Sequence, residues 1–184
     1  MNGFLKQLIE NKEYQKARNE LIEMKVIDIA QALEDLEEEE MLILFRILPK
    51  EIAAGGFSYI PNDLQQYIIE SITDKETNSI MDKLFMDDTI DFLEEMPSNV
   101  VKKVLKNTDE ETRQIINQFL KYPEDSAGSI MTIEFVDLKK NMTVGEALDY
   151  IRATGVDKET INTCYVIDSV RKLEGVVSIR KLIL

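Results

Sequence analysis

The sequence contains no histidine, no tryptophan and a single cysteine, Cys164, among its 184 residues. Zinc, copper and iron sites need clustered imidazoles or thiolates, so this composition argues strongly against a transition-metal site. A catalytic triad or a histidine general base is excluded within the chain. One cysteine cannot form an internal disulfide, which is typical of a reducing compartment. Any metal must therefore be a hard cation bound by oxygen, such as magnesium, calcium or manganese.

Basic residues and long hydrophobic runs are also scarce. The chain has 35 acids against 22 bases and a formal charge of −13, which argues against nucleic acid as a partner. The most apolar stretch, "MLILFRILP" from Met41, is shorter than the roughly 18 residues of a membrane span. The chain also lacks a phosphate-binding glycine loop and a nucleophile–base pair, so we predict that it is not an enzyme.

What the first 120 or so residues do contain is a repeat of short helical patterns. Units end at positions 49, 61, 74, 87, 97 and 109, in steps of 12, 13, 13, 10 and 12 residues. Each carries apolar residues at helical spacing. Helices this short cannot bury an apolar stripe alone and must stack on one another. We therefore predict a mainly α fold, a right-handed superhelix (α-solenoid) of short helices.

Helix start signals lie at the unit boundaries. Pro49, Pro61 and Pro97 suit a first helical position, where the missing N–H is not needed. Thr73 with Glu76, and Thr108 with Glu111, have the spacing of a capping box.

After Gly128 the pattern changes to β-branched and apolar alternation. Residues 133–138 predict a strand, and 143–155 predict a helix opened by Thr143 and closed by Gly155. Residues 163–170 and 174–184 predict two further strands, and the chain reaches Leu184 on an apolar run with no closing helix. We predict a helical domain at 1–122, a linker at 123–132 in which Glu124, Asp125 and Ser126 are structural, and a truncated α/β domain at 133–184.

The join carries a resemblance to a known family. "YPEDSAGSIMTIEFVDLKKNMTVGEAL" resembles the passage between the helical N domain and the first CBS domain of MgtE-type magnesium channels, and "LFRILPKEIAAGGF" and "MDDTIDFLEEMP" resemble the repeats of that N domain. The resemblance covers residues 27–184 and implies that 133–184 is a partial CBS domain.

The resemblance also implies a function. In the family these cytosolic domains form a magnesium sensor in a homodimer, ahead of a membrane pore that closes when Mg²⁺ bridges acidic faces of the N and CBS domains. It implies that this region is the cytoplasmic part of a cell-membrane protein, with its pore beyond Leu184. An alternative is a stand-alone regulatory adaptor with the same folds and no pore. The reading frame after Leu184 distinguishes the two.

In the family, acids at the positions of Asp87 and Asp91 contribute to the magnesium interface between the N and CBS domains, so the resemblance implies Asp87 and Asp91 as metal ligands, with Asp88 as a further candidate. Four residues apart on a helix, Asp87 and Asp91 share a face, and a divalent cation between them and a second acidic surface would remove their repulsion. A purely structural interpretation stays open, because Asp87 and Asp88 open a helix and there stabilise its dipole. A third acid of the family falls on Gly55. The acidic run 34–40 is interpreted as a solvated surface.

The resemblance implies one nucleotide-binding residue, Arg180. The acid that usually follows it is Lys181 here, and the family's aromatic contact falls on Thr163. These departures argue against ATP as a ligand of this chain. Cys164 is predicted to be a buried structural thiol, because no basic neighbour in the sequence lowers its pKa.

Overall fold

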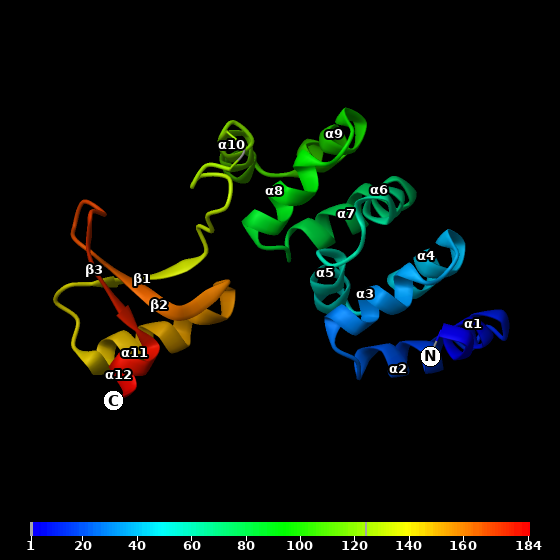
Figure 1. The fold of residues 1–184 in the computed structure, drawn as a ribbon, viewed down its shortest axis with the longest axis horizontal. Helices are drawn as coiled ribbons and strands as arrows, with labels where there is room; N and C mark the ends of the chain where they lie inside the picture. Colours follow the sequence, from blue (N-terminus) through cyan, green and yellow to red (C-terminus); the bar gives the residue numbers. More distant parts are fainter. Residues whose placement is uncertain (1, 124) are drawn as a thin grey trace. The chain divides into compact units, whose positions relative to one another are not determined.

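A computed structural model describes residues 2–123 and 125–184, which divide into two compact units, Met1–Ser129 and Ile130–Leu184 (Figure 1). Short helices account for most of the first unit. They are α1 (Asn2–Glu10), α2 (Tyr14–Ile22), α3 (Val26–Glu34), α4 (Glu38–Ile47), α5 (Lys50–Phe57), α6 (Asn62–Ser71), α7 (Asp74–Met81), α8 (Met86–Glu94), α9 (Ser98–Asn107) and α10 (Glu110–Phe119). No helix in the described part of the chain is long and apolar enough to cross a bilayer.

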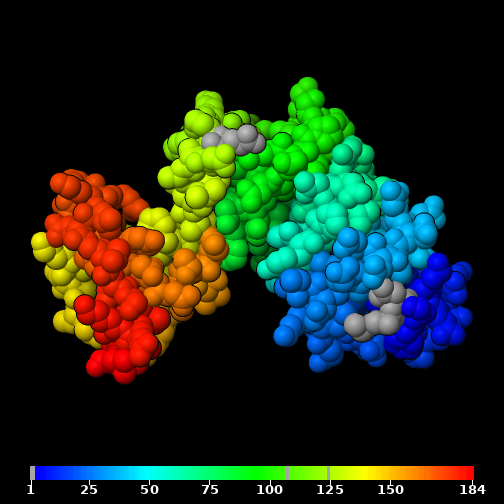
Figure 2. All heavy atoms as spheres, viewed as in Figure 1, coloured from blue at the N-terminus to red at the C-terminus, as the bar shows by residue number. Residues whose placement is uncertain are grey.

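The helices of the first unit stack with their next-but-one neighbours. Helices α3, α5, α7 and α9 contact each other in turn, as do α2, α4 and α6, and α8 contacts α10. In Figure 2 the colours of this unit accordingly advance from blue to green along its length. Each helix contributes an apolar stripe to the interior, as Ile68 and Ile69 do from α6. The predicted stacking of short helices is confirmed.

Prolines mark three helix starts, one residue earlier than predicted. Pro49, Pro61 and Pro97 are the N-cap residues of α5, α6 and α9, with φ between −65° and −55° and extended ψ. The fixed φ of proline suits this position, and the N–H that proline lacks is not required there.

Side-chain caps agree with the sequence at one predicted site of this unit and differ at the other. Thr73 and Glu76 form the predicted capping box at α7. At α10 the predicted box is wrong, because the N-cap is Asp109, whose carboxylate accepts from the Thr112 N–H at 3.0 Å. The Thr108 hydroxyl donates back to the Val104 carbonyl oxygen instead, and so it cannot cap the next helix.

The end of α6 is tied down by cations from neighbouring helices. Lys103 Nζ donates to the carbonyl oxygens of Ile69 and Ile72 at 2.5 and 2.6 Å, and Arg46 donates to that of Ser71 at 3.0 Å. Cations stabilise the unpaired carbonyls at a helix C-terminus. These bonds hold α6, which borders the candidate site, in place.

The first unit ends in a tight turn. Gly128 lies against Tyr122, where a Cβ would be 2.5 Å from the ring carbon Cγ, so only glycine fits. Ser126 Oγ accepts from the Ser129 N–H at 3.3 Å, as expected of a structural residue. Asp125 has φ of 60°, a left-handed conformation that aspartate tolerates. Glu124 lies outside the described residues. The division between the units falls inside 123–132, and the predicted domain boundaries stay a prediction.

The second unit is a small α/β arrangement. It comprises β1 (Phe135–Lys139), α11 (Val144–Thr154), the 3₁₀ turn η1 (Gly155–Asp157), β2 (Thr160–Ile167), β3 (Leu173–Ser178) and α12 (Ile179–Ile183). The sheet order is β1-β2-β3, with β1 parallel to β2 and β2 antiparallel to β3. Its core contains Val136, Leu138, Ala147, Ile151 and Cys164. The predicted Thr143 cap is confirmed as a complete box with Glu146.

The expectation that no helix follows the last strand is wrong. Ser178 Oγ accepts from the Lys181 N–H and opens α12. Ile179 and Leu182, three residues apart, both pack on the core of this unit. Residues three apart share a helix face, whereas alternate residues share a strand face, so the apolar run 179–184 follows the helical period.

Candidate functional site

Helix α8 carries the three predicted acids. Its buried face consists of Thr89, Ile90, Phe92 and Leu93, and the Phe92 ring meets the Phe57 ring edge-on at 5.2 Å. Because this packing fixes the rotation of α8, Asp87, Asp88 and Asp91 are held at the remaining surface. Asp87 and Asp88 lie in the first turn, where their charges favour the helix dipole.

Asp87 and Asp91 stand one helical turn apart and interact. The pKa of Asp91 is raised, first by partial burial of its carboxylate and then by the charge of Asp87. One carboxylate oxygen of Asp87, Oδ1, is buried and has no hydrogen-bond partner among the described residues. A nearby cation would remove the repulsion between the two carboxylates and would give the Asp87 oxygen a partner.

Asp88 is engaged differently. Its Oδ2 accepts from the Ser58 hydroxyl at 2.9 Å, a bond that joins α8 to the residue after α5. The Ser58 hydroxyl donates this bond, and its oxygen can still accept a hydrogen bond from another group. Asp88 therefore has a structural role in the unit, whatever it contributes to a ligand.

The raised pKa of Asp91 predicts a pH-dependent effect of Asp91→Asn. Ionised Asp91 destabilises the folded chain at neutral pH, and this penalty vanishes as pH falls and the group is protonated in both states. In magnesium-free buffer the variant should therefore melt at a slightly higher temperature than the parent at pH 7 and at the same temperature near pH 3. An equal or lower melting temperature at pH 7 would contradict the assignment. Thermal melts followed by circular dichroism at both pH values make the comparison.

The pair supplies only part of a metal site. No group of three or more acidic, cysteine or histidine residues in the described ranges converges closely enough to hold a metal ion. Gly55, which the resemblance matches to a third acid of the family, supplies no carboxylate, and a Cβ added there would only make ordinary van der Waals contact with Val26 Cγ1 at 3.4 Å. A magnesium ion held at Asp87 and Asp91 would need water and ligands from another surface.

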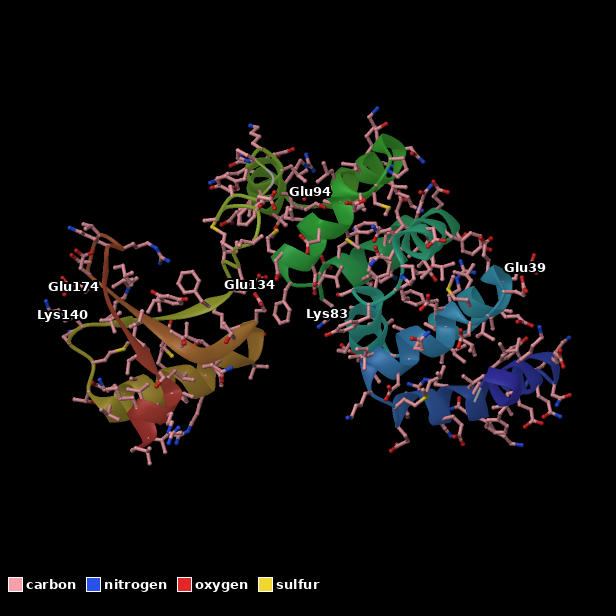
Figure 3. The ribbon with its side chains drawn as sticks, in the orientation of Figure 1. Glu39, Lys83, Glu94, Glu134, Lys140 and Glu174 are labelled. Carbon is pink, nitrogen blue, oxygen red and sulfur yellow. The ribbon has the colours of Figure 1, made fainter. Side chains whose placement is uncertain are left out.

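Sequence reasoning missed a polar hollow beside α8. Ser58, Asn62, Gln65, Asp88, Asp91, Phe92, Glu94 and Glu95 line this α6–α8 hollow, which encloses about 310 Å³. Figure 3 labels Glu94 on α8. The spacing of Asp88, Asp91 and Glu95 gave a signal, since residues three and seven apart lie on one helix face. The contribution of α6 could not be read from the sequence.

The remaining predicted residues lie elsewhere. The acidic run spans the end of α3 and the start of α4, where Glu37, Glu38 and Glu39 are exposed, in line with a solvated surface. Arg180 is exposed in α12 rather than at a strand end. Cys164 is buried in β2 as predicted, and burial raises the pKa of its thiol.

Comparisons with known proteins agree with the resemblance seen in the sequence. The MgtE intracellular N domain family matches residues 24–125. The magnesium transporter MgtE of Thermus thermophilus is 28% identical over 182 residues, which cover 97% of this chain and 40% of that protein. The chain thus spans less than half of this relative. The names of such relatives are those of transport proteins, in line with the prediction that the chain is not an enzyme.

Two solved structures share the whole fold. The crystal structure of the soluble part of a magnesium transporter matches with a TM-score of 0.89 and 25% identity, over 100% of this chain and 72% of that chain. The cytosolic domain of the Mg²⁺ channel MgtE in complex with ATP matches with a TM-score of 0.89 and 28% identity, over 100% and 75% respectively. The predicted fold class, a helical region followed by a small α/β region, is confirmed.

Proposed function

The chain belongs to the MgtE intracellular N domain family, and from this premise we propose that it is the magnesium-sensing and gating region of a magnesium transporter. Asp87 and Asp91 act as the N-domain side of a regulatory site. The pore closes when Mg²⁺ bridges their acidic face and an acidic face of the CBS domain.

The electrostatics of α8 are the observation that carries this proposal. The raised pKa of Asp91 and the unpaired Oδ1 of Asp87 mark two carboxylates that form no ion pair with a lysine or arginine among the described residues. Magnesium takes one or two carboxylates and keeps several waters, so it suits a site shared between two surfaces. Without the metal, the two negative surfaces repel and stay apart.

The partners follow from the same proposal. The chain covers 40% of the length of the Thermus transporter, and we place a transmembrane pore domain in the part of the protein beyond Leu184. The protein would lie in the cell membrane as a homodimer with this region in the cytoplasm.

A magnesium titration of the full-length protein tests the proposal. The segment 123–132 contains one glutamate, Glu124, and no lysine or arginine, so cleavage after Glu124 by a glutamate-specific protease, identified by fragment mass, reports on it. Cleavage after Glu124 should slow at millimolar magnesium, and small-angle scattering should show that the protein becomes more compact. Sodium chloride at matched ionic strength should do neither. Unchanged cleavage and scattering across the titration would contradict the proposed role.

Nucleotide binding gives a separate prediction. We propose that Lys181 weakens ATP binding, because a cation stands where the family has an acid that accepts from ribose hydroxyls. Lys181→Asp in the full-length protein should raise ATP affinity by about tenfold, the value of one good hydrogen bond to a charged group. Isothermal calorimetry measures the change, and Lys172→Asp, at another exposed lysine of the second unit, controls for net charge. Equal affinities in the two variants would contradict the role of Lys181.

A further inference from the structure

The α6–α8 hollow contains a buried amide with an unused acceptor. Gln65 is only 4% exposed. Its Nε2 donates to the Phe57 carbonyl oxygen at 2.7 Å, and this fixes which side of the amide carries the oxygen. The oxygen, Oε1, is buried with no hydrogen-bond partner among the described residues. A buried acceptor left unpaired is costly, so this atom points to a missing N–H or O–H donor.

The rim of the hollow is strongly negative. Asp88, Asp91, Glu94 and Glu95 contribute four carboxylates. Across the ranges that the structure describes, no lysine or arginine forms an ion pair with Asp91, Glu94 or Glu95. A donor that enters this hollow should therefore also carry positive charge.

The positions of these carboxylates indicate whether a metal ion or an organic cation would bind. No three acidic groups in the described part of the chain converge as a metal requires. A cation whose charges are spaced along a chain can meet separated carboxylates one at a time, and each ammonium group offers hydrogen-bond donors. The volume of about 310 Å³ lies at the lower end of the range for small-molecule sites.

We propose that the α6–α8 hollow binds a linear aliphatic polyamine. One ammonium group donates to Gln65 Oε1 after a small shift of the groups that bury this atom, and the others pair with the carboxylates of Asp91, Glu94 and Glu95. Phe92 lines the hollow as well and offers an apolar surface to the methylene segments. This site goes beyond the proposed magnesium site in its ligand and in its use of α6, and it shares with it Asp91 and the further candidate Asp88.

Calorimetric titration of the magnesium-free, full-length protein with spermidine tests the proposal. A salt concentration of about 0.15 M screens long-range attraction to the acidic surface. We expect saturable binding. Glu94→Gln with Glu95→Gln should weaken it by about tenfold or more, since two ammonium–carboxylate ion pairs are replaced by hydrogen bonds to neutral amides. The matched control, Glu38→Gln with Glu39→Gln on α4, removes the same charge from exposed positions and should leave affinity within about twofold.

Gln65→Met provides the second arm, because it keeps the size of the side chain and removes the acceptor. It should also lower spermidine affinity, with circular dichroism and a melting curve confirming the fold. Equal losses in the two double glutamate variants would reduce the binding to non-specific attraction and overturn the proposal. A titration without saturation would overturn it too. Unchanged affinity in Gln65→Met would also overturn it, because the ligand would then make no use of Oε1. None of these variants alters Asp87 or Asp91, so failure here leaves the magnesium test unaffected.

Discussion

Full-length protein carrying Asp87→Asn and Asp91→Asn is expected to need about tenfold or more magnesium to protect the segment 123–132 from proteolysis. Two unit charges 4 Å apart attract by about 4 kcal/mol at an effective dielectric constant of 20. Removing water from the carboxylates costs part of this energy. A tenfold change in affinity corresponds to only about 1.4 kcal/mol. The amides keep the size and a weaker oxygen ligand, so the variant isolates the loss of charge.

The matched control for this experiment is again Glu38→Gln with Glu39→Gln, because both residues are exposed on the first turn of α4. If magnesium acted by general screening of the −13 charge, both double variants would shift the midpoint alike. A shift confined to the α8 variant would support a specific site. The midpoint is measured from cleavage rates against magnesium concentration at constant ionic strength. An unshifted midpoint in the α8 variant would remove these residues from the sensor.

The second large effect is expected at the centre of the helical unit. Phe57→Ala should lower the free energy of unfolding by about 3–5 kcal/mol, the range for a buried phenylalanine. Phe57 is fully buried at the end of α5, with its ring 5.2 Å from that of Phe92 and 6.3 Å from that of Phe45. Removal of the Phe57 ring would leave a cavity under α8. The variant therefore also tests whether the core positions the candidate site.

Urea unfolding of the chain, followed by far-ultraviolet circular dichroism, measures this loss. Tyr59→Ala is the control, because Tyr59 lies two residues further on and is 56% exposed; its cost should stay within about 0.5 kcal/mol. A cost below about 2 kcal/mol for Phe57→Ala would mean that the neighbouring helices collapse into the space.

The sequence predicted the helical unit well because its signals are local. The repeat of about 12 residues, the proline boundaries and the Thr73 and Thr143 capping boxes depend on residues within a few positions of each other. The change of pattern near Gly128 likewise separated the helical region from the α/β region. The absence of histidine limited any metal site to oxygen ligands, and the linker motif carried the family resemblance that the comparisons confirm.

Other features depend on contacts between distant segments. Asp109 rather than Thr108 caps α10 because the Thr108 hydroxyl bonds back to the preceding helix. The run 179–184 is a helix because Ile179 and Leu182 both find the core of the second unit. A short apolar run fits a strand or a helix equally well until packing selects one of the two periods.

By itself, then, the sequence determined the class of fold, the oxygen-only ligand chemistry and the acids of α8, since residue type and short spacing are written in the chain. Tertiary structure alone decided which of those acids face a common space. Gln65 joins Asp91 and Glu95 in one hollow only because α6 is fixed beside α8, partly by Lys103 from α9, 34 residues away from Ile69 in the chain. Such juxtapositions follow from how helices pack, and no local pattern encodes them.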